Sequence, residues 1–557
     1  MPLRIAFAFL CAFAAVARAE LYLHPLFSDG AVLQRGQPVP VWGTATPGAK
    51  VEVVFAGQSA FATADESGNW RATLAPIAAS GESRELLARG DGVTLAIREV
   101  VVGDVWLASG QSNMDSPMSS GSAAQSLAEA SDPLLRFYKV QKAVAAGRQA
   151  APKGKWSASS PTATRELTAV GYFFAREIRK SQNVPVAILH SAWGGTPIKT
   201  WTPIAAFEAE PPVQPLLAEW KNAYAKHVAN RDKPELLQAY YAERKEWEEQ
   251  VDKPFRAARD AHPAAVLAAR AAGQPPPAAP KHSRPKPESP DPTAMPAPAT
   301  SDRPATPSIA YNAMIAPLAP YAIKGALWYQ GEADSSRGLG YRDLLPRLIK
   351  GWRAVWEQGD FPFLIVQLPG HGKDVEPVAS QNTNIAWLRE AQDLAARNVP
   401  AAGLAVTVDI GDAADVHPDN KVHVGSRLAQ LARETVYREP GVVGVGPRYA
   451  SHRAEEASIR IRFTNTGSGL TPAAAPWTAK GGVSLPTDKL VGFFVAGADR
   501  KWVAAESRID GETVIVSASE VSAPVAVRYA WASTPAANLY NRDGLPAAPF
   551  RTDDWAR

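Results

Sequence analysis

Residues 101–118 read VVGDVWLASGQSNMDSPM and join an apolar run to a polar turn. The apolar part has the length and composition of a buried strand, and the SGQSNMDS that follows is typical of a strand-to-helix turn. Ser112 is therefore expected just past the carboxyl end of a strand, the edge at which open parallel sheets build their sites. A second interpretation makes Ser112 the N-cap of the next helix, where serine is common.

Four later segments have the same form, an apolar run that ends in polar residues or glycine. They are VPVAILHSAWGG (184–195), AIKGALWYQGEAD (322–334), FPFLIVQLPG (361–370) and AAGLAVTVDIGD (401–412). Helical patterns lie between them, such as YRDLLPRLIKGWRAVW at residues 341–356. This alternation predicts an α/β domain with a parallel sheet, which we place at residues 101–435.

Short alternating strands flank this domain on both sides. Residues 20–100 contain PVPVWG and TPGAKVEVVFAG, and residues 436–557 contain ASIRIRFTN and APVAVRYAW. Period-two apolarity punctuated by glycine and proline predicts a β-sandwich-like domain at each end. A chain of 557 residues agrees with a plan of several domains.

An insertion at about residues 204–307 interrupts the α/β pattern. Its first part is charged and helically spaced, as in ELLQAYYAERKEWEEQV, which predicts solvent-facing helices. Residues 273–307 are rich in proline, and we interpret them as a flexible, solvated linker. A polyproline segment that binds a partner is the alternative.

Residues 1–19 have the three parts of a secretory signal. Arg4 precedes an apolar run at residues 5–16, and the small residues Ala17 and Ala19 complete the cleavage pattern. The apolar run is shorter than the ~20 residues of a membrane span. We therefore expect a cleaved signal and a secreted or periplasmic protein without a membrane anchor, most typical of a bacterium.

The composition excludes several classes of function. Cys11 is the only cysteine and lies in the signal, which excludes thiol catalysis and Cys-ligated metals in the mature chain. The formal net charge of +4 falls to +2 when Arg4 and Arg18 leave with the signal. The remaining basic residues are scattered, so the sequence predicts neither a nucleic acid nor a membrane surface as a partner. The oligomeric state is left open.

His417 is the candidate general base for a serine nucleophile. It follows the apolar run of residues 401–410, so it also lies past a predicted strand end, and the acids near it are Asp409, Asp412, Asp415 and Asp419. His24, His190, His371 and His423 lack such a setting, and we interpret each as a surface or core histidine. His417 and His423 are a possible metal pair, but they would lie on different faces of a helix and no third imidazole is near, so we predict no metal.

Two other strand ends supply donors for an oxyanion. Gly194 and Gly195 have unencumbered backbone amides, and Gln330 has a side-chain amide. The alternatives are a simple turn for the glycine pair and a structural hydrogen bond for Gln330.

Four ordered motifs together resemble the sialate O-acetylesterase family of SGNH hydrolases. They are GQSNM (110–114), WGGTPIKTW (193–201), WYQGEAD (328–334) and DVHPDNK (415–421), and the likeness extends to PVPVWGTATPG near the N-terminus. The resemblance covers nearly all of the chain after the signal except the insertion. It implies a flavodoxin-like three-layer fold and a metal-independent hydrolase, without a cofactor, that releases acetate from an acetylated sugar.

The resemblance also implies roles for individual residues. Ser112 would be the nucleophile and His417 the catalytic histidine, and the oxyanion hole would combine the amides of Ser112 and Gly195 with the side chain of Gln330. Beyond the resemblance, we assign substrate-binding or supporting roles to Asn113, Trp193, Trp328 and Glu332. For the tryptophans, stacking on a sugar ring and packing in the core are the alternatives, and for Glu332 the alternative is a purely structural role.

The acid of the triad departs from the wider SGNH pattern. That pattern places it three residues before the histidine, where this chain has Ala414. We assign the role to Asp415, with Asp412 or a backbone carbonyl as alternatives.

The predicted function is hydrolysis of O-acetyl esters on a carbohydrate by acyl transfer through Ser112. The sequence leaves open whether the carbohydrate is sialic acid or a plant hemicellulose such as xylan or xyloglucan. The alternative from another class is a carbohydrate-binding protein without catalysis.

Overall fold

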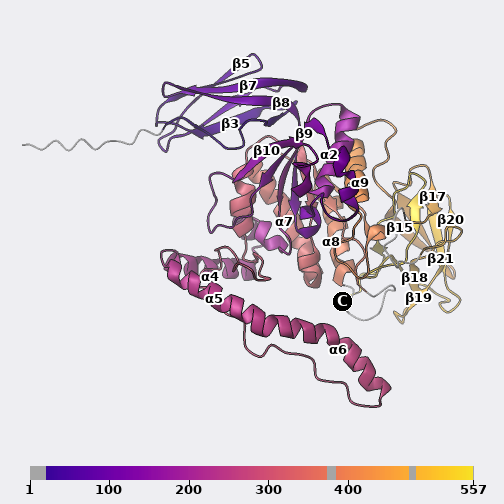
Figure 1. The fold of residues 1–557 in the computed structure, drawn as a ribbon. Helices are drawn as coiled ribbons and strands as arrows, with labels where there is room; N and C mark the ends of the chain where they lie inside the picture. Colours follow the sequence, from indigo (N-terminus) through magenta and orange to yellow (C-terminus); the bar gives the residue numbers. More distant parts are fainter. Residues whose placement is uncertain (1–19, 373–383, 476–483, 556–557) are drawn as a thin grey trace, which may run out of the picture.

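The computed structural model describes residues 20–372, 384–475 and 484–555. The predicted signal at residues 1–19 lies outside them. Figure 1 shows a central α/β body, β-rich regions at opposite ends of it and a long helical projection. No helix in the described ranges is long and apolar enough to cross a membrane.

A seven-strand path forms the centre of the largest sheet, in the order β10-β9-β11-β8-β12-β13-β14. The strands are β8 (Val93–Gly110), β9 (Asp132–Val140), β10 (Gly154–Ser159), β11 (Val186–Ala192), β12 (Gly325–Tyr329), β13 (Phe363–Val366) and β14 (Ala402–Ala405). Only β10 runs antiparallel to its neighbour on this path. The α/β prediction is confirmed, although the sheet is mixed rather than wholly parallel.

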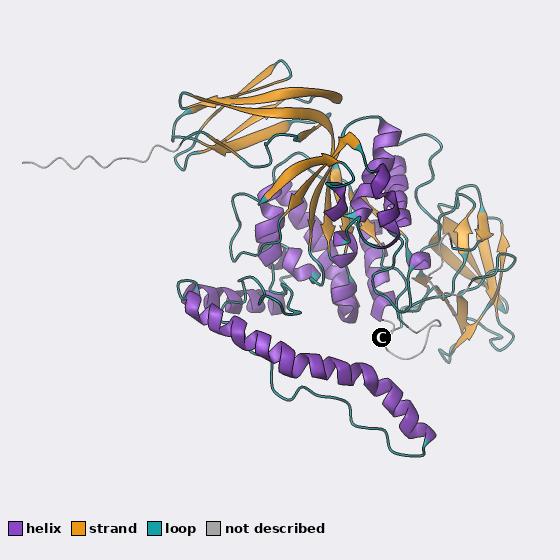
Figure 2. Cartoon of the chain, in the orientation of Figure 1, coloured by secondary structure: helices purple, strands orange, loops and turns teal. Residues whose placement is uncertain are grey.

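Helices lie on both sides of these strands (Figure 2). The long ones are α2 (Ala169–Gln182), α7 (Gly338–Trp356), α8 (Asn384–Asn398) and α9 (Lys421–Thr435), where α2 packs with α9 and α7 packs with α8. Every residue of β11, β12 and β13 is buried, as expected for strands covered on both faces.

The N-terminal strands are joined to the central sheet through β8. They are β1 (Tyr22–Leu23), β2 (Val32–Gln34), β3 (Val39–Thr44), β4 (Lys50–Phe55), β5 (Gln58–Thr63), β6 (Asn69–Leu74) and β7 (Ser80–Gly90). β2 and β7 pair with β8, while β1, β3 and β6 form a separate sheet. Along β8, burial changes near residue 100 from partial and intermittent to continuous. The predicted boundary between residues 100 and 101 therefore falls inside one continuous strand. The positive φ of Glu99, a register shift against β7 and the change in burial mark the junction within it.

The C-terminal strands enclose a second hydrophobic core. They are β15 (Arg448–Glu455), β16 (Ser458–Thr464), β17 (Leu470–Pro472), β18 (Phe493–Ala496), β19 (Trp502–Ala504), β20 (Glu506–Asp510), β21 (Thr513–Ser517), β22 (Ala526–Tyr529), β23 (Leu539–Asn541) and β24 (Phe550–Arg551). Two four-stranded sheets, one containing β16 and β21 and the other β18 and β22, contribute to this core. A sandwich arrangement at either end of the chain stays a prediction.

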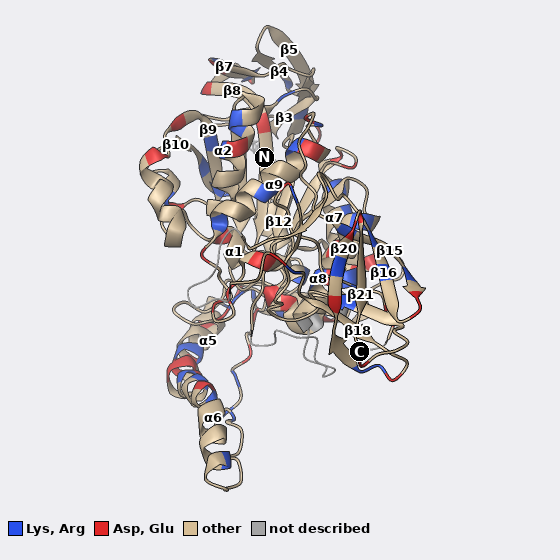
Figure 3. Cartoon of the chain, turned by 90° about the vertical axis from the view of Figure 1, so that its right-hand side faces the viewer, with Lys and Arg blue, Asp and Glu red and all other residues tan. Residues whose placement is uncertain are grey.

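The insertion is a helical projection that leaves the body after α3 (Ile204–Glu208). It contains α4 (Gln214–Asn230), α5 (Pro234–Trp247), a π-helical turn (Glu248–Asp252) and α6 (Lys253–Ala271). Acidic and basic residues are interspersed along α5 (Figure 3). The predicted charged helical insertion is present in the structure.

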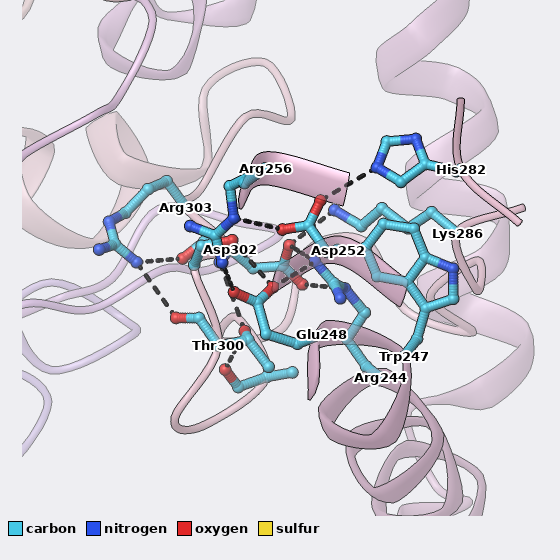
Figure 4. A network of polar contacts seen from close by, with 12 residues as sticks. Arg244, Trp247, Glu248, Asp252, Arg256, His282, Lys286, Thr300, Asp302 and Arg303 are labelled. Atoms are coloured by element: carbon cyan, nitrogen blue, oxygen red, sulfur yellow. Dashed lines mark hydrogen bonds and ion pairs between the residues drawn. The ribbon is translucent and has the colours of Figure 1, made fainter. Parts of the chain in front are cut away.

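The interpretation of residues 273–307 as a flexible, solvated linker is wrong for the later part of the segment, which packs against the helices from His282 onward. Residues 273–279 are exposed, as predicted. The indole of Trp247 donates to the carbonyl of Arg284 at 3.1 Å, and the Tyr241 hydroxyl donates to the carbonyl of Met295 at 3.1 Å. Arg244 of α5, which is 2% exposed, donates to both carboxylate oxygens of Asp302 (Figure 4). Composition alone predicted solvation because these partners lie on other elements.

Candidate active site

Three neighbouring strands end level with one another at the site. Gly110 of β8 is paired with Ala192 of β11 on one side and with Tyr329 of β12 on the other. The strands that follow β8 in sequence, β9 to β11, lie on one side of β8 in the sheet. The later strands β12, β13 and β14 lie on its other side. This is a topological switch point, where the loops after adjacent strands diverge and leave room for a ligand.

Gly110 makes the turn that presents Ser112. Its φ is +140°, and a Cβ at this position would lie 2.0 Å from the carbonyl oxygen of Tyr329. Ser112 then begins the short helix α1 (Ser112–Asp115), whose N-cap residue is Gln111. The interpretation of Ser112 as an N-cap is therefore wrong, and its hydroxyl is available for other contacts.

The Ser112 hydroxyl lies 2.9 Å from Nε2 of His417. His417 is in the loop between β14 and α9, and its side chain is 51% exposed. Burial of the rest of the ring lowers its pKa, Lys421 and His371 lower it further, and the Asp415 carboxylate opposes the shift. The imidazole is thus kept in its neutral form, which can accept the serine proton.

Asp415 contacts His417 mainly through the backbone. Its carboxylate accepts a hydrogen bond from the His417 N–H at 2.8 Å and lies 3.5 Å from the ring Nδ1, beyond the usual hydrogen-bond length. The carboxylate of Asp412 accepts the N–H groups of Ala414 and Asp415, so it shapes the loop. Asp415 is the acid closest to a triad position, and its role stays a prediction.

Of the glycine pair predicted for the oxyanion hole, Gly194 lies against Ser112 and Gly195 lies against Arg303. A Cβ on Gly194 would be 3.1 Å from Cβ of Ser112, so a side chain there would crowd the serine. Gly195 adopts φ +75°, a conformation that favours glycine. The Ser112 N–H is the first in α1 and has no partner within the helix.

Gln330 is fully buried and holds three loops together. Its amide nitrogen lies 3.1 Å from the carbonyl of Thr196, 3.2 Å from Oε1 of Gln111 and 2.6 Å from Oδ2 of Asp334. Its Oε1 accepts from the hydroxyl of Tyr341 at 2.9 Å. Both amide hydrogens therefore have internal acceptors, and direct donation to an oxyanion does not fit these contacts.

Asn113 links the helix that begins at Ser112 to the loop that carries His417. Its amide donates to Oε1 of Glu332 at 2.5 Å and to the carbonyl of Val416 at 2.9 Å. Its Oδ1 accepts from the amine of Lys421 at 2.6 Å. Asn113 is fully buried, so its side chain stabilises the surrounding loops and does not contact a substrate. Burial raises the pKa of Glu332.

The two tryptophans predicted near the substrate differ in position. Trp328 is fully buried, donates to the hydroxyl of Tyr341 at 3.1 Å and packs edge-on against Trp352. Trp328 is therefore a core residue, the alternative left open for the tryptophans, and a direct sugar contact does not fit its position. Trp193 starts the glycine loop and is 9% exposed, so its contact with substrate stays a prediction.

A cavity of about 430 Å³ adjoins the catalytic loop. Its lining consists of Glu332, Ser335, Leu368, Pro369, His371, Ile385, Val416 and Ser533. Sequence reasoning treated His371 as an ordinary surface or core histidine, although it follows β13 just as His417 follows β14. The strand-end rule would have found it, whereas Ser533 comes from the C-terminal region and gave no local signal.

The C-terminal region is fixed to this cavity by Arg389 of α8. The fully buried guanidinium donates to the carbonyls of Leu368 and Pro369 and to those of Ala532 and Ser533. Within the described ranges, no group of three or more His, Cys, Asp or Glu side chains is placed to hold a metal ion.

Comparison with known proteins identifies the family. A sequence profile described as "Carbohydrate esterase, sialic acid-specific acetylesterase" matches residues 102–261 and 305–434, so it leaves out residues 262–304 of the projection. Sialate O-acetylesterase of Rattus norvegicus is 27% identical, with 92% of this chain and 90% of the rat protein covered. Sialate O-acetylesterase of Homo sapiens is 25% identical, with 73% and 69% covered.

A solved structure is similar over almost the whole chain. It is a carbohydrate acetylesterase from Xanthomonas citri, 34% identical, with a TM-score of 0.72 and with 96% of this chain and 100% of that chain covered. The protein belongs to the sialic acid-specific acetylesterase family of carbohydrate esterases and is a carboxylic ester hydrolase.

Proposed function

We propose that the protein removes O-acetyl groups from a carbohydrate with Ser112 as nucleophile and His417 as general base. The observation that carries this proposal is the 2.9 Å separation of the Ser112 hydroxyl and Nε2 of His417 at the strand ends. A serine and a neutral imidazole at this distance can transfer a proton as the serine attacks. Membership in an esterase family removes the alternative of a non-catalytic binding protein.

The reaction proceeds in two acyl transfers. His417 takes the Ser112 proton while the serine oxygen attacks the acetyl carbonyl, and the protonated imidazole then gives that proton to the departing sugar oxygen. Water, deprotonated by His417, attacks the acetyl-serine, and acetate leaves as the serine regains its proton. Asp415 stabilises the imidazolium as it forms.

Backbone amides provide the oxyanion hole in this proposal. The N–H groups of Ser112 and Gly195 are the donors, because the first belongs to a helix N-terminus and the second to a glycine loop beside the nucleophile. Gln330 was predicted as a third donor. Its contacts support a structural role instead, in which Gln330 fixes the loop that contains Thr196 relative to Gln111.

The cavity beside Val416 is the proposed sugar site. Leu368, Ile385 and Val416 give it apolar walls for the C–H faces of a sugar ring. The side chains of His371, Ser335 and Ser533 supply hydrogen-bonding groups for hydroxyls.

The lining of the cavity favours a neutral carbohydrate. Among the described residues that line it, none is a lysine or arginine, and Glu332 is acidic. A sugar carboxylate, as in sialic acid, would find no cationic partner in this lining, although Arg303 lies against Gly195 next to Ser112. This supports acetylated hemicellulose, such as xylan or xyloglucan, as a second candidate substrate beside acetylated sialic acid. With a signal at residues 1–19, such a substrate would be met outside the cytoplasm.

Acetate release tests the proposal. Purified enzyme and Ser112→Ala are incubated with O-acetylated sialic acid, acetylated xylan and acetylated xyloglucan, and acetate is measured enzymatically. We expect release from at least one carbohydrate by the wild type and none above background by the variant. Equal release by a folded Ser112→Ala variant would refute the role of the serine.

A further inference from the structure

We propose that Lys421 is a positioning residue that holds the His417 loop against Ser112. The inference rests on the proposed function, because it assigns a cause to the geometry of the Ser112–His417 pair. His417 is half exposed, and its nearest carboxylate, Asp415, lies 3.5 Å from the ring, so this acid alone holds the imidazole only loosely near Ser112.

Lys421 occupies a position that is unfavourable for a lysine. Its side chain is 3% exposed, and burial lowers its pKa to about 8 against the opposing charges of Glu332 and nearby aspartates. It is also the first residue of α9, where the helix dipole disfavours a positive charge. A buried cation at a helix N-terminus costs stability unless its hydrogen bonds are strong.

The contacts of Lys421 explain its presence. The amine donates to the carbonyl of Pro418 and to Oδ1 of Asn113, both at 2.6 Å. The amide of Asn113 in turn donates to the carbonyl of Val416 at 2.9 Å. The backbone is therefore held on both sides of His417, directly at the residue after it and through Asn113 at the residue before it.

The same contacts reach the nucleophile and the β12 loop. Asn113 follows Ser112 directly in α1, so a shift of Asn113 moves the serine as well. Asn113 also donates to Glu332, whose carboxylate offsets the charge of Lys421 within the buried network. Lys421 thus fixes the relative position of two chain segments that lie about 300 residues apart in sequence.

The test separates positioning from stability. Lys421→Met removes the donors and leaves Glu332 as a buried, uncompensated carboxylate, so we expect a lower melting temperature. Lys421→Met combined with Glu332→Gln removes both charges and should recover most of that loss. In the double variant we still expect kcat on p-nitrophenyl acetate to fall by about 10- to 100-fold with little change in KM.

The pH profile gives a readout that a structural role would not move. Lys421 lowers the pKa of His417, so the acid limb of kcat/KM should shift to higher pH in the double variant. Lys142→Met is the matched control, because Lys142 is an exposed cation that pairs with Asp115 beside α1 at 2.6 Å and does not contact the His417 loop. This control should keep wild-type kcat and acid limb.

The outcomes distinguish this proposal from the proposed function. A folded double variant with kcat within about twofold of wild type and an unmoved acid limb would overturn the role of Lys421, even if Ser112→Ala is inactive. Activity in Ser112→Ala would instead overturn the proposed function. If the double variant does not fold, Lys421→Gln, which keeps one donor amide without the charge, is measured by the same criteria.

Discussion

The carboxylate of Asp415 accepts a hydrogen bond from the backbone N–H of His417 at 2.8 Å but lies 3.5 Å from the ring Nδ1 of the same residue. Both side chains are more than half exposed. A solvated acid at this distance orients an imidazole less firmly than a buried, hydrogen-bonded one.

The variants Asp415→Asn and Asp412→Asn should differ in activity. We expect Asp415→Asn to lower kcat/KM by about 10- to 100-fold, less than the roughly 10⁴-fold loss of a buried triad acid. Asp412→Asn should cost less than about threefold, because its carboxylate contacts backbone amides rather than the ring. Side-by-side kinetics on p-nitrophenyl acetate decide the matter, and a larger loss in Asp412→Asn would reverse the assignment.

The acid limb of the pH profile should lie below the ordinary histidine value. His417 must be neutral to act, so activity falls as pH falls through its pKa, and burial places that pKa under about 6.5. Asp415 raises this pKa, so Asp415→Asn should move the limb to still lower pH. Measurement of kcat/KM between pH 4 and 9 gives both values; a limb above the ordinary value would contradict the assignment of His417 as the titrating base.

Gly194→Ala should impair catalysis more than folding. The added methyl would lie 3.1 Å from Cβ of Ser112, so the serine must shift by a few tenths of an ångström. We expect kcat to fall about tenfold with a nearly unchanged melting temperature. Gly340→Ala, in α7 with open space around the new methyl, is the control and should retain full activity. Wild-type kcat in Gly194→Ala would show that Ser112 tolerates the contact.

The packed insertion gives a prediction about proteolysis. Arg244 is buried between Glu248 and Asp302. Arg244→Met removes this buried cation, while Arg256 still pairs with Glu248 and Lys286 with Asp302, so we expect the local packing to weaken by about 1–3 kcal/mol. We expect residues 282–307 to resist limited proteolysis in the wild type and to be cleaved faster in this variant. Arg259→Met removes an exposed pair with Asp260 and should behave as wild type. Rapid cleavage of the wild-type segment would restore the interpretation of a solvated linker.

The proposed catalytic residues could be predicted because each lies past a strand end. Ser112 and His417 follow apolar runs, and parallel strands bring their carboxyl ends to one edge. The same rule applied to residues 361–370 would have placed His371 at the site. The shared strand β8 was missed because the charged residues Arg98 and Glu99 separate two apolar runs in the sequence, whereas the structure joins both runs in one strand with Glu99 in a left-handed conformation between them.

The remaining features depend on contacts between distant segments. Gln330 has a side chain suited to an oxyanion hole, and only its neighbours Thr196 and Asp334 show that the amide is occupied. Proline content predicted a solvated segment because the sequence does not show that Arg244 and Trp247 form hydrogen bonds with it. The aromatic character of Trp328 suggested a sugar platform, whereas its place within an all-buried strand makes it core.

Peptide mapping of the acid-quenched enzyme can locate the acyl group. Wild type mixed with p-nitrophenyl acetate and quenched within the first turnover should carry one acetyl group on Ser112, because the hydroxyl 2.9 Å from His417 is the proposed nucleophile. The Ser112→Ala variant, folded by its melting temperature, should carry none and release no acetate. An acetyl group on another residue that forms and decays at the rate of turnover, or undiminished turnover in Ser112→Ala, would contradict catalysis by Ser112.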